Sequence, residues 1–150
     1  MVFATHMTAA LEQARLAEDR GEVPVGAVVV GPSGDVIGAA GNETRTGQDP
    51  TAHAEVLAIR RACGALQSDR LEGCTLFVTL EPCAMCAGAI ALARIKRVVY
   101  GAADPKSGGT DHGARVFSHR QSHHKPEVVG GIMEMECKKI LTDFFANRRP

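Results

Sequence analysis

Two short apolar runs rich in β-branched residues, residues 75–80 and 97–101, flank a segment of helical length. Pro82 indicates that a helix begins directly after the first run and continues to about Arg94, because proline is tolerated at the first helical position. Two strands separated by a helix of this length predict a parallel βαβ unit with a right-handed crossover. The chain is therefore expected to form an α/β fold.

The remaining segments extend this unit to a complete layered domain. Apolar residues at helical spacing predict three more helices, at residues 7–20, 52–66 and 133–144. Runs of β-branched and small residues predict three more strands, at residues 25–30, 36–40 and 127–129. We therefore predict one domain over residues 1–150, a three-layer α/β/α fold with a central mixed sheet of about five strands.

Charge and hydropathy exclude several classes of protein. The 17 basic and 17 acidic residues give a net charge of zero, so the strongly basic field of a broad nucleic-acid-binding surface is absent. Positive charge is expected to gather locally, around Lys106, Lys138, Arg148 and Arg149. No apolar run approaches the ~20 residues of a membrane span, and the N-terminal segment lacks a secretory pattern, so a cytoplasmic protein without membrane contacts is expected. There the five cysteines should stay reduced, which favours metal binding or chemistry over disulfides.

Cys83 and Cys86 form a C-x-x-C pair at the predicted start of a helix, where both sulfurs can face one side. The partial positive charge of a helix N-terminus lowers the pKa of thiols there and favours the thiolates that bind metal. By themselves the two cysteines are equally consistent with a redox dithiol. His53, at the start of another predicted helix, changes this balance, because two thiolates and an imidazole are ligand types that zinc prefers.

Glu55 completes an ordered H-x-E…P-C-x-x-C pattern, which is typical of zinc nucleobase deaminases whose glutamate moves protons and is not a ligand. Three protein ligands leave the fourth position open, as in a catalytic zinc site. Residues two apart on an ideal helix point in nearly opposite directions, so a site shared by His53 and Glu55 requires a reach around the helix end. A structural zinc site would need a fourth ligand, for which the candidates are Cys63, Cys74, Cys137, His119, His123 and His124.

Five segments resemble the bacterial tRNA-specific adenosine deaminases of the cytidine deaminase superfamily: residues 22–28, 49–55, 81–89, 97–102 and 141–149. The resemblance extends over almost the whole chain. It implies a cytidine deaminase-like fold and zinc-dependent hydrolytic conversion of adenosine to inosine at the wobble position of tRNA. It also implies a homodimer that binds the tRNA anticodon stem-loop.

The same resemblance assigns roles to individual residues. His53, Cys83 and Cys86 are expected to hold one Zn²⁺ per subunit, and Glu55 is expected to shuttle protons. Substrate binding is assigned to Asn42, Ala54, Asp104, Lys106, Phe145 and Arg149. Of these, Asn42 is expected to hydrogen-bond the flipped base. For Phe145 and Arg149 the alternatives are burial in the core and a solvated tail, respectively.

One segment departs from this family. Residues 108–126, within the long irregular segment expected after Gly101, do not follow the family's usual course through a small-residue turn and a leucine-containing stretch to an Asn-His pair. A free nucleobase deaminase, acting on guanine or cytosine, could use the same catalytic core with a different rim and is the alternative hypothesis. A third hypothesis is a non-enzymatic zinc-binding or redox module.

Overall fold

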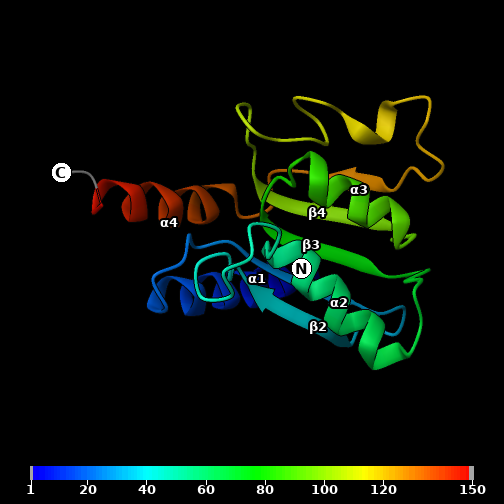
Figure 1. The fold of residues 1–150 in the computed structure, drawn as a ribbon, viewed down its shortest axis with the longest axis horizontal. Coiled ribbons are helices and arrows are strands. Elements are labelled where there is room, and N and C mark those ends of the chain that lie inside the picture. Colours follow the sequence, from blue (N-terminus) through cyan, green and yellow to red (C-terminus); the bar gives the residue numbers. More distant parts are fainter. Residues whose placement is uncertain (1, 149–150) are drawn as a thin grey trace.

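The computed structural model describes residues 2–148 (Figure 1). In chain order its elements are α1 (Val2–Asp19), β1 (Gly26–Val30), β2 (Val36–Gly41), α2 (Ala54–Leu66), β3 (Thr75–Leu80), α3 (Ala84–Leu92), β4 (Arg97–Ala102), the 3₁₀ turn η1 (Val116–Ser118), β5 (Glu127–Val129) and α4 (Glu134–Ala146). Every helix and strand expected from the sequence is present. Among residues 2–148, no helix is both long enough and apolar enough to cross a bilayer.

The five strands form one mixed sheet in the order β2-β1-β3-β4-β5. β1 pairs antiparallel with β2 and β3, whereas β3 is parallel to β4 and β4 is parallel to β5. The predicted βαβ unit is therefore confirmed as β3-α3-β4. Because β3, β4 and β5 run the same way, their carboxyl ends meet at one edge of the sheet, which is where ligands bind in open α/β sheets.

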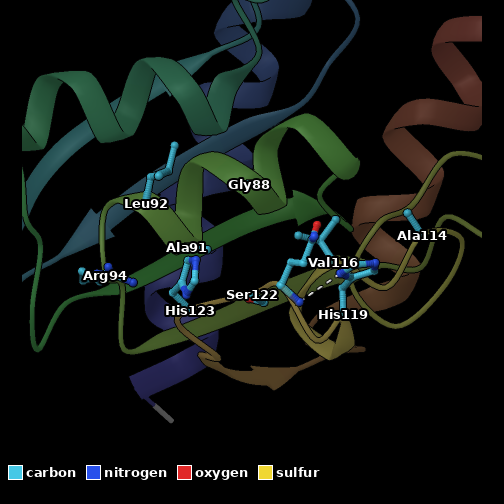
Figure 2. A pocket seen from close by; sticks show the side chains of 10 residues that line it. Gly88, Ala91, Leu92, Arg94, Ala114, Val116, His119, Ser122 and His123 are labelled. Atoms are coloured by element: carbon cyan, nitrogen blue, oxygen red, sulfur yellow. Dashed lines mark hydrogen bonds between the residues drawn. The ribbon is translucent and has the colours of Figure 1, made fainter.

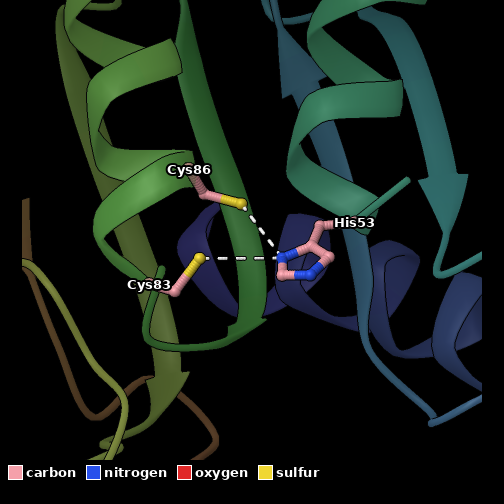
Figure 3. Close-up of side chains that lie close together, drawn as sticks. All are labelled: His53, Cys83 and Cys86. Carbon is pink, nitrogen blue, oxygen red and sulfur yellow. Dashed lines mark hydrogen bonds between the residues drawn. The ribbon is translucent and has the colours of Figure 1, made fainter. Parts of the chain in front are cut away.

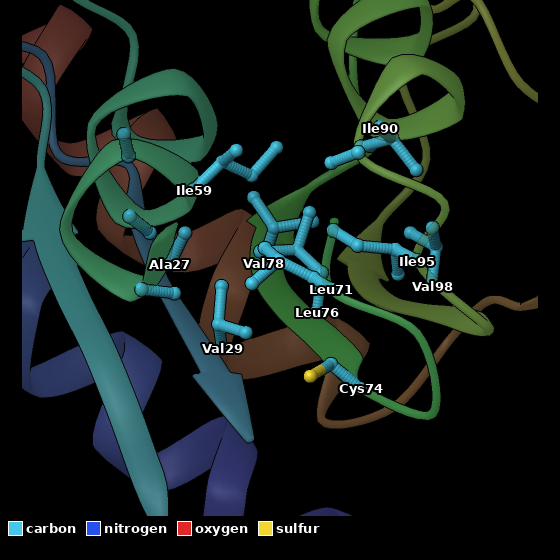
Figure 4. Close-up of a cluster of buried hydrophobic side chains, with 14 of the residues drawn as sticks. Ala27, Val29, Ile59, Leu71, Cys74, Leu76, Val78, Ile90, Ile95 and Val98 are labelled. Atoms are coloured by element: carbon cyan, nitrogen blue, oxygen red, sulfur yellow. The ribbon is translucent and has the colours of Figure 1, made fainter. Parts of the chain in front are cut away.

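Alternate residues of each strand point to opposite faces of the sheet and build two separate cores. Ala27 and Val29 of β1 pack with α2 and α3 in one core (Figure 4), whereas Val28 and Val30 pack with α1 and α4 in the other. Figure 1 shows α2 and α3 in front of the sheet and α1 behind it. The three-layer α/β/α fold predicted from the sequence is thus confirmed.

The two helices that carry the sequence motif begin later than expected. α3 begins at Ala84 with Cys83 as its N-cap, so the expectation that Pro82 occupies the first helical position is wrong. The reason is that Cys83 is extended and the carbonyl of Pro82 accepts a hydrogen bond from Gly109 N (2.8 Å) outside the helix. Likewise, α2 begins at Ala54, directly after the extended N-cap His53.

The backbone of α2 lies directly on β2, and a glycine makes this approach possible. A Cβ atom at Gly38 would clash with Ala58 O and would lie 2.8 Å from Ala62 N, both in the backbone of α2. This contact determines how far α2 stands from the sheet. It therefore also places the N-terminus of α2, where His53 lies.

We expect Gly38→Ala to lower the free energy of unfolding by about 2 kcal/mol, because the added methyl group must push α2 away from the sheet. Gly64→Ala is the matched control. Gly64 lies in α2 with nothing within 4 Å of its Cβ position, so alanine there should raise the free energy of unfolding by about 0.5 to 1 kcal/mol through helix propensity. Urea unfolding followed by circular dichroism measures both changes. Unchanged or greater stability of Gly38→Ala would contradict this packing.

Candidate active site and metal centre

A pocket of about 310 Å³ opens at the edge of the sheet where β3 and β4 end. Its walls come from the segments flanking β1 and β2, from the N-termini of α2 and α3, and from the loop after β4. Among the residues that line it are Asn42, His53, Glu55, Cys83 and Asp104. Two helix N-termini at one pocket concentrate partial positive charge there, which favours thiolates and other anions.

Three potential metal ligands converge at this pocket (Figure 3). His53 Nδ1 lies 3.6 Å from Cys83 Sγ and 3.4 Å from Cys86 Sγ, and the three ligand atoms all lie within 4.8 Å of one another. His53 and Cys83 are the N-caps of α2 and α3, and Cys86 lies in the first turn of α3. Two helices that begin at the same edge of the sheet thus bring the two halves of the sequence motif together.

The donor set and its spacing suit a tetrahedral metal ion. Bonds of about 2.3 Å to sulfur and about 2.0 Å to nitrogen place tetrahedral ligand atoms roughly 3.5 to 3.8 Å apart. The two nitrogen–sulfur distances, 3.6 and 3.4 Å, are close to this range. Within residues 2–148, no other His, Cys, Asp or Glu side chain joins the group, so a metal held by these side chains would have three protein ligands.

The candidates for a fourth protein ligand lie elsewhere. Cys74 packs in the core beside α2 and α3, and Cys137 packs in the core beside α1 and α4. The imidazole of His124 hydrogen-bonds a backbone carbonyl (2.6 Å). His119 and His123 line a separate pocket of about 420 Å³ between α3 and the segment after β4 (Figure 2). These residues therefore do not complete a structural zinc site.

Hydrogen bonds among the three side chains separate their pKa values. Hydrogen bonds from Cys86 and His53 lower the pKa of Cys83 to about 3, against the opposing effect of burial. The hydrogen bond to Cys83, together with burial, raises the pKa of Cys86. The same partner raises the pKa of His53. Cys83 is therefore a thiolate at neutral pH, which is the form that binds metal.

Glu55 lies in the first turn of α2 and lines the same pocket. His53 has an extended backbone and precedes the helix, so the angular separation of residues two apart on a helix does not apply to this pair. Burial raises the pKa of Glu55 to about 7. A carboxyl group with a pKa near neutrality can both accept and donate a proton, as general acid–base chemistry requires.

Three of the residues expected to bind the substrate differ in their placement. Asn42 and Asp104 line the pocket, and the amide of Asn42 donates a hydrogen bond to Thr44 Oγ1 (3.4 Å). Ala54 is buried in the core beside α2 and α3 and is not among the lining residues. The pocket also contains Ser107, which sequence reasoning missed; its backbone N–H donates a hydrogen bond to Asp104 Oδ1 (2.9 Å).

Two of the other residues expected to bind the substrate are exposed. Lys106 is exposed on the loop after β4. Phe145 is 47% exposed and lines a groove beside α4, so the alternative of burial in the core is wrong. Leu80 lines both this groove and the pocket, so the two hollows adjoin. Arg149 lies outside the described residues.

Sequence reasoning also missed two fully buried glutamates, Glu81, which lines the pocket, and Glu22, which lies under a loop that lines it. Burial would raise the pKa of each carboxyl group, but hydrogen bonds from surrounding N–H and hydroxyl groups outweigh it and hold both pKa values below the usual range. Both side chains are therefore carboxylates at neutral pH. The available signal was weak: each glutamate stands at the border of an apolar segment, where a solvated residue is the usual interpretation.

In protein stripped of metal, we expect iodoacetamide to alkylate Cys83 at pH 6, because its lowered pKa leaves it ionised at any pH well above 3. Cys63 is the control: it is also half-buried, but burial raises its pKa, so its alkylation should be slow at pH 6 and should increase with pH. Peptide mass spectrometry measures both reactions. Faster alkylation of Cys63 than of Cys83 at pH 6 would show that Cys83 is not the thiolate.

Sequence comparison relates this site to known proteins. The profile of the MafB19-like deaminase family matches residues 3–149. The chain is 52% identical to a tRNA-specific adenosine deaminase of Agrobacterium fabrum (strain C58 / ATCC 33970), over 99% of this chain and 98% of that protein. It is 47% identical to a tRNA-specific adenosine deaminase of Bacillus subtilis (strain 168), over 96% of this chain and 89% of that protein.

Solved structures share the fold. A structure from work on A-to-I editing by tRNA:A34 deaminases has a TM-score of 0.89 and 52% identity, covering 91% of this chain and 99% of that chain. Guanine deaminase from Nitrosomonas europaea, at 23% identity, has a TM-score of 0.83 over 95% of this chain and 84% of that chain, a likeness of fold. The chain therefore matches the MafB19-like deaminase family and belongs to the family of the tRNA-specific adenosine deaminases.

Proposed function

We propose that this protein hydrolytically deaminates adenosine to inosine at the wobble position of a tRNA anticodon, with release of ammonia. One observation carries the proposal: the group formed by His53, Cys83 and Cys86 lies beside the buried carboxyl group of Glu55 at a single pocket. This combination supports hydrolytic deamination of a nucleobase. Identity of 52% to a tRNA-specific adenosine deaminase over 99% of the chain favours adenosine in tRNA among the possible substrates.

The metal in this proposal is Zn²⁺, one per chain, held by His53, Cys83 and Cys86. An imidazole and two thiolates are ligands that zinc prefers, and three protein ligands with an open fourth position are typical of catalytic zinc. When bound, zinc supplies Lewis-acid activation of water at neutral pH. The two ligand thiols must stay reduced, which favours the cytoplasm as the compartment of the reaction.

Glu55 moves the protons in this reaction. Its carboxylate accepts a proton from the attacking water and donates one to N1 of the adenine ring, while the water oxygen bonds to C6. A second proton passes through the same carboxyl group to the exocyclic amine, which leaves as ammonia. The pKa of about 7 suits both transfers, because neither the protonated nor the ionised form is strongly disfavoured at neutral pH.

The pocket suits a single base taken out of its stack. Its volume of about 310 Å³ lies at the small end of the range for ligand sites. Asn42, in its wall, is the residue proposed to hydrogen-bond the base edge. Recognition of a few unstacked bases depends on shape, stacking and hydrogen bonds more than on a wide basic surface, which agrees with a net charge of zero.

The groove beside α4 is the proposed path for the nucleotides that flank the target. It adjoins the pocket at Leu80 and presents the exposed ring of Phe145 together with Lys138. An aromatic ring can stack on a base, and a lysine can neutralise a phosphate. Lys106, exposed on the loop after β4, supplies further positive charge at the pocket rim.

The proposed assembly is a homodimer that uses the outer face of α3. The helix consists entirely of apolar and small residues, yet only Cys86, Ala87 and Ile90 are buried in one chain. Leu92 remains 80% exposed and Met85 39% exposed. A helix that is apolar on all sides is normally covered on all sides, so a second copy of the chain is the proposed cover.

The function is tested with zinc-loaded protein and an arginine tRNA anticodon stem-loop that carries adenosine at the wobble position. We expect inosine at that position, detected by nuclease digestion and mass spectrometry. Glu55→Gln should retain one zinc per chain but lose turnover by about 10³-fold, because it cannot act as a general base. Glu12→Gln, at an exposed position on α1, is the control and should keep full activity.

The same assay separates the alternatives. Absence of inosine with zinc-loaded protein would contradict the proposed function. Ammonia release from free guanine or cytosine, without inosine in the stem-loop, would instead favour the free nucleobase deaminase. Zinc binding with no deamination of any of these substrates would favour a non-enzymatic module.

For the dimer, we expect Leu92→Asp to yield a monomer, because the substitution places a charge at the most exposed large apolar side chain of α3, at the C-terminal end of the helix. Met135→Asp is the matched control: Met135 is 82% exposed on α4 and lies outside the proposed interface. Sedimentation velocity of the three proteins measures the change. A monomeric parent protein, or a dimer that survives Leu92→Asp, would contradict the proposed interface.

A further inference from the structure

Two loops contribute residues to the pocket rim, and each rests on a buried carboxylate. We call residues 42–49 the first rim loop and residues 103–112 the second rim loop. Glu22 lies beneath the first and Glu81 beneath the second, and both are fully buried. Neither glutamate has a role in the chemistry proposed above.

Glu22 holds the first rim loop through three hydrogen bonds. Its Oε1 accepts one from Arg45 N (3.2 Å), and its Oε2 accepts one from Thr46 N (2.7 Å) and one from Thr46 Oγ1 (2.8 Å). Asn42 and Thr44, in the same loop, line the pocket. The conformation of this part of the rim therefore depends on an acceptor that lies outside the loop.

Glu81 makes still more contacts with the second rim loop. Its Oε1 contacts Asp104 N (3.0 Å) and His112 Nδ1 (2.7 Å). Its Oε2 accepts hydrogen bonds from the backbone N–H groups of Thr110 (3.3 Å), Asp111 (3.0 Å) and His112 (3.0 Å), and from Thr110 Oγ1 (3.1 Å). The side chain of Glu81 thus contacts both ends of the second rim loop.

The second rim loop also packs closely against the residues around Cys83. A Cβ atom at Gly108 would lie 2.6 Å from Glu81 Oε2, and one at Gly109 would lie 2.5 Å from Ala84 N. Gly109 N donates a hydrogen bond to Pro82 O (2.8 Å). The loop is therefore seated on the residues that flank Cys83, and two glycines are needed at the contact.

Burying a carboxylate is unfavourable unless hydrogen bonds replace its water. Here most of the donors are backbone N–H groups of the rim loops, and these groups point at the carboxylate only when each loop has its observed shape. Conversely, removing one carboxylate leaves several N–H groups without an acceptor at once. The negative charge of each buried carboxylate and the conformation of the rim loop above it therefore depend on each other.

We propose that Glu22 and Glu81 are positioning residues for substrate recognition, each holding one rim loop in the shape that lines the pocket. Neither residue acts on the reacting atoms. The choice of substrate in the test rests on the proposed function, whereas the role of the two carboxylates in holding the loops does not.

Glu22→Gln and Glu81→Gln test the proposal, because the amide group of glutamine presents N–H groups where the loops require an acceptor. We expect the amide hydrogens of the affected loop to exchange at least about tenfold faster. We expect KM for the stem-loop to rise about tenfold while kcat changes by less than about threefold, since binding is impaired and Glu55 is untouched. Zinc content should remain one per chain.

Milder variants keep the proposal testable if either glutamine variant fails to fold. Thr46→Val and Thr110→Val each remove one hydroxyl hydrogen bond to a buried carboxylate and should raise KM by about threefold. Thr79→Val is the matched control. Thr79 is buried, as Thr110 is, and its hydroxyl accepts a hydrogen bond from Gly26 N (3.1 Å) within the sheet, so this variant should lose stability without a change in KM.

The outcomes are distinct. Unchanged exchange in both loops, or an equal rise in KM for Thr79→Val, would overturn the proposal. Loss of zinc from Glu81→Gln would also overturn it, because Glu81 would then support the metal site. If the parent protein does not deaminate the stem-loop, the proposed function fails, and hydrogen exchange still decides whether the carboxylates hold the loops.

Discussion

The site depends on two helices that begin side by side at the carboxyl edge of one sheet. α3 must begin there because it is the crossover between the parallel strands β3 and β4. α2 is seated on β2 at Gly38, where its backbone leaves no room for a side chain. Because His53 and Cys83 are the N-caps of these helices, ligand atoms far apart in the sequence lie 3.6 Å apart. The pocket, the buried acid and both rim loops are arranged around this junction.

Three buried carboxyl groups lie at this edge of the sheet, and their surroundings shift their pKa values in opposite directions. Burial is the largest influence on the pKa of Glu55 and raises it to about 7, which suits this group to proton transfer. Glu22 and Glu81 are equally hidden from water, but many hydrogen bonds lower their pKa values and keep them charged. Hydrogen bonds that outweigh the effect of burial therefore keep Glu22 and Glu81 charged, whereas burial dominates at Glu55 and leaves it able to exchange a proton.

Local patterns were sufficient to predict the architecture but not the contacts around the site. Strands such as residues 97–101 and the βαβ unit follow from residue type and spacing along the chain. The ordered H-x-E…P-C-x-x-C motif predicted that His53, Cys83 and Cys86 share one site. The predicted start of α3 was wrong because the carbonyl oxygen of Pro82 accepts a hydrogen bond from Gly109 N, which is distant in sequence. Glu81 was missed for the same reason, since its donors lie 23 to 31 positions away.

X-ray absorption at the zinc edge of the zinc-loaded protein tests whether His53, Cys83 and Cys86 alone hold the metal, because it reports the ligands of the metal without assuming a substrate. A zinc site with three protein ligands predicts two sulfur neighbours at about 2.3 Å and two lighter neighbours at about 2.0 Å, one from His53 and one from solvent. A third or fourth sulfur neighbour would contradict it. The metal would then have four protein ligands, as in a structural site, and no coordination position open to the pocket.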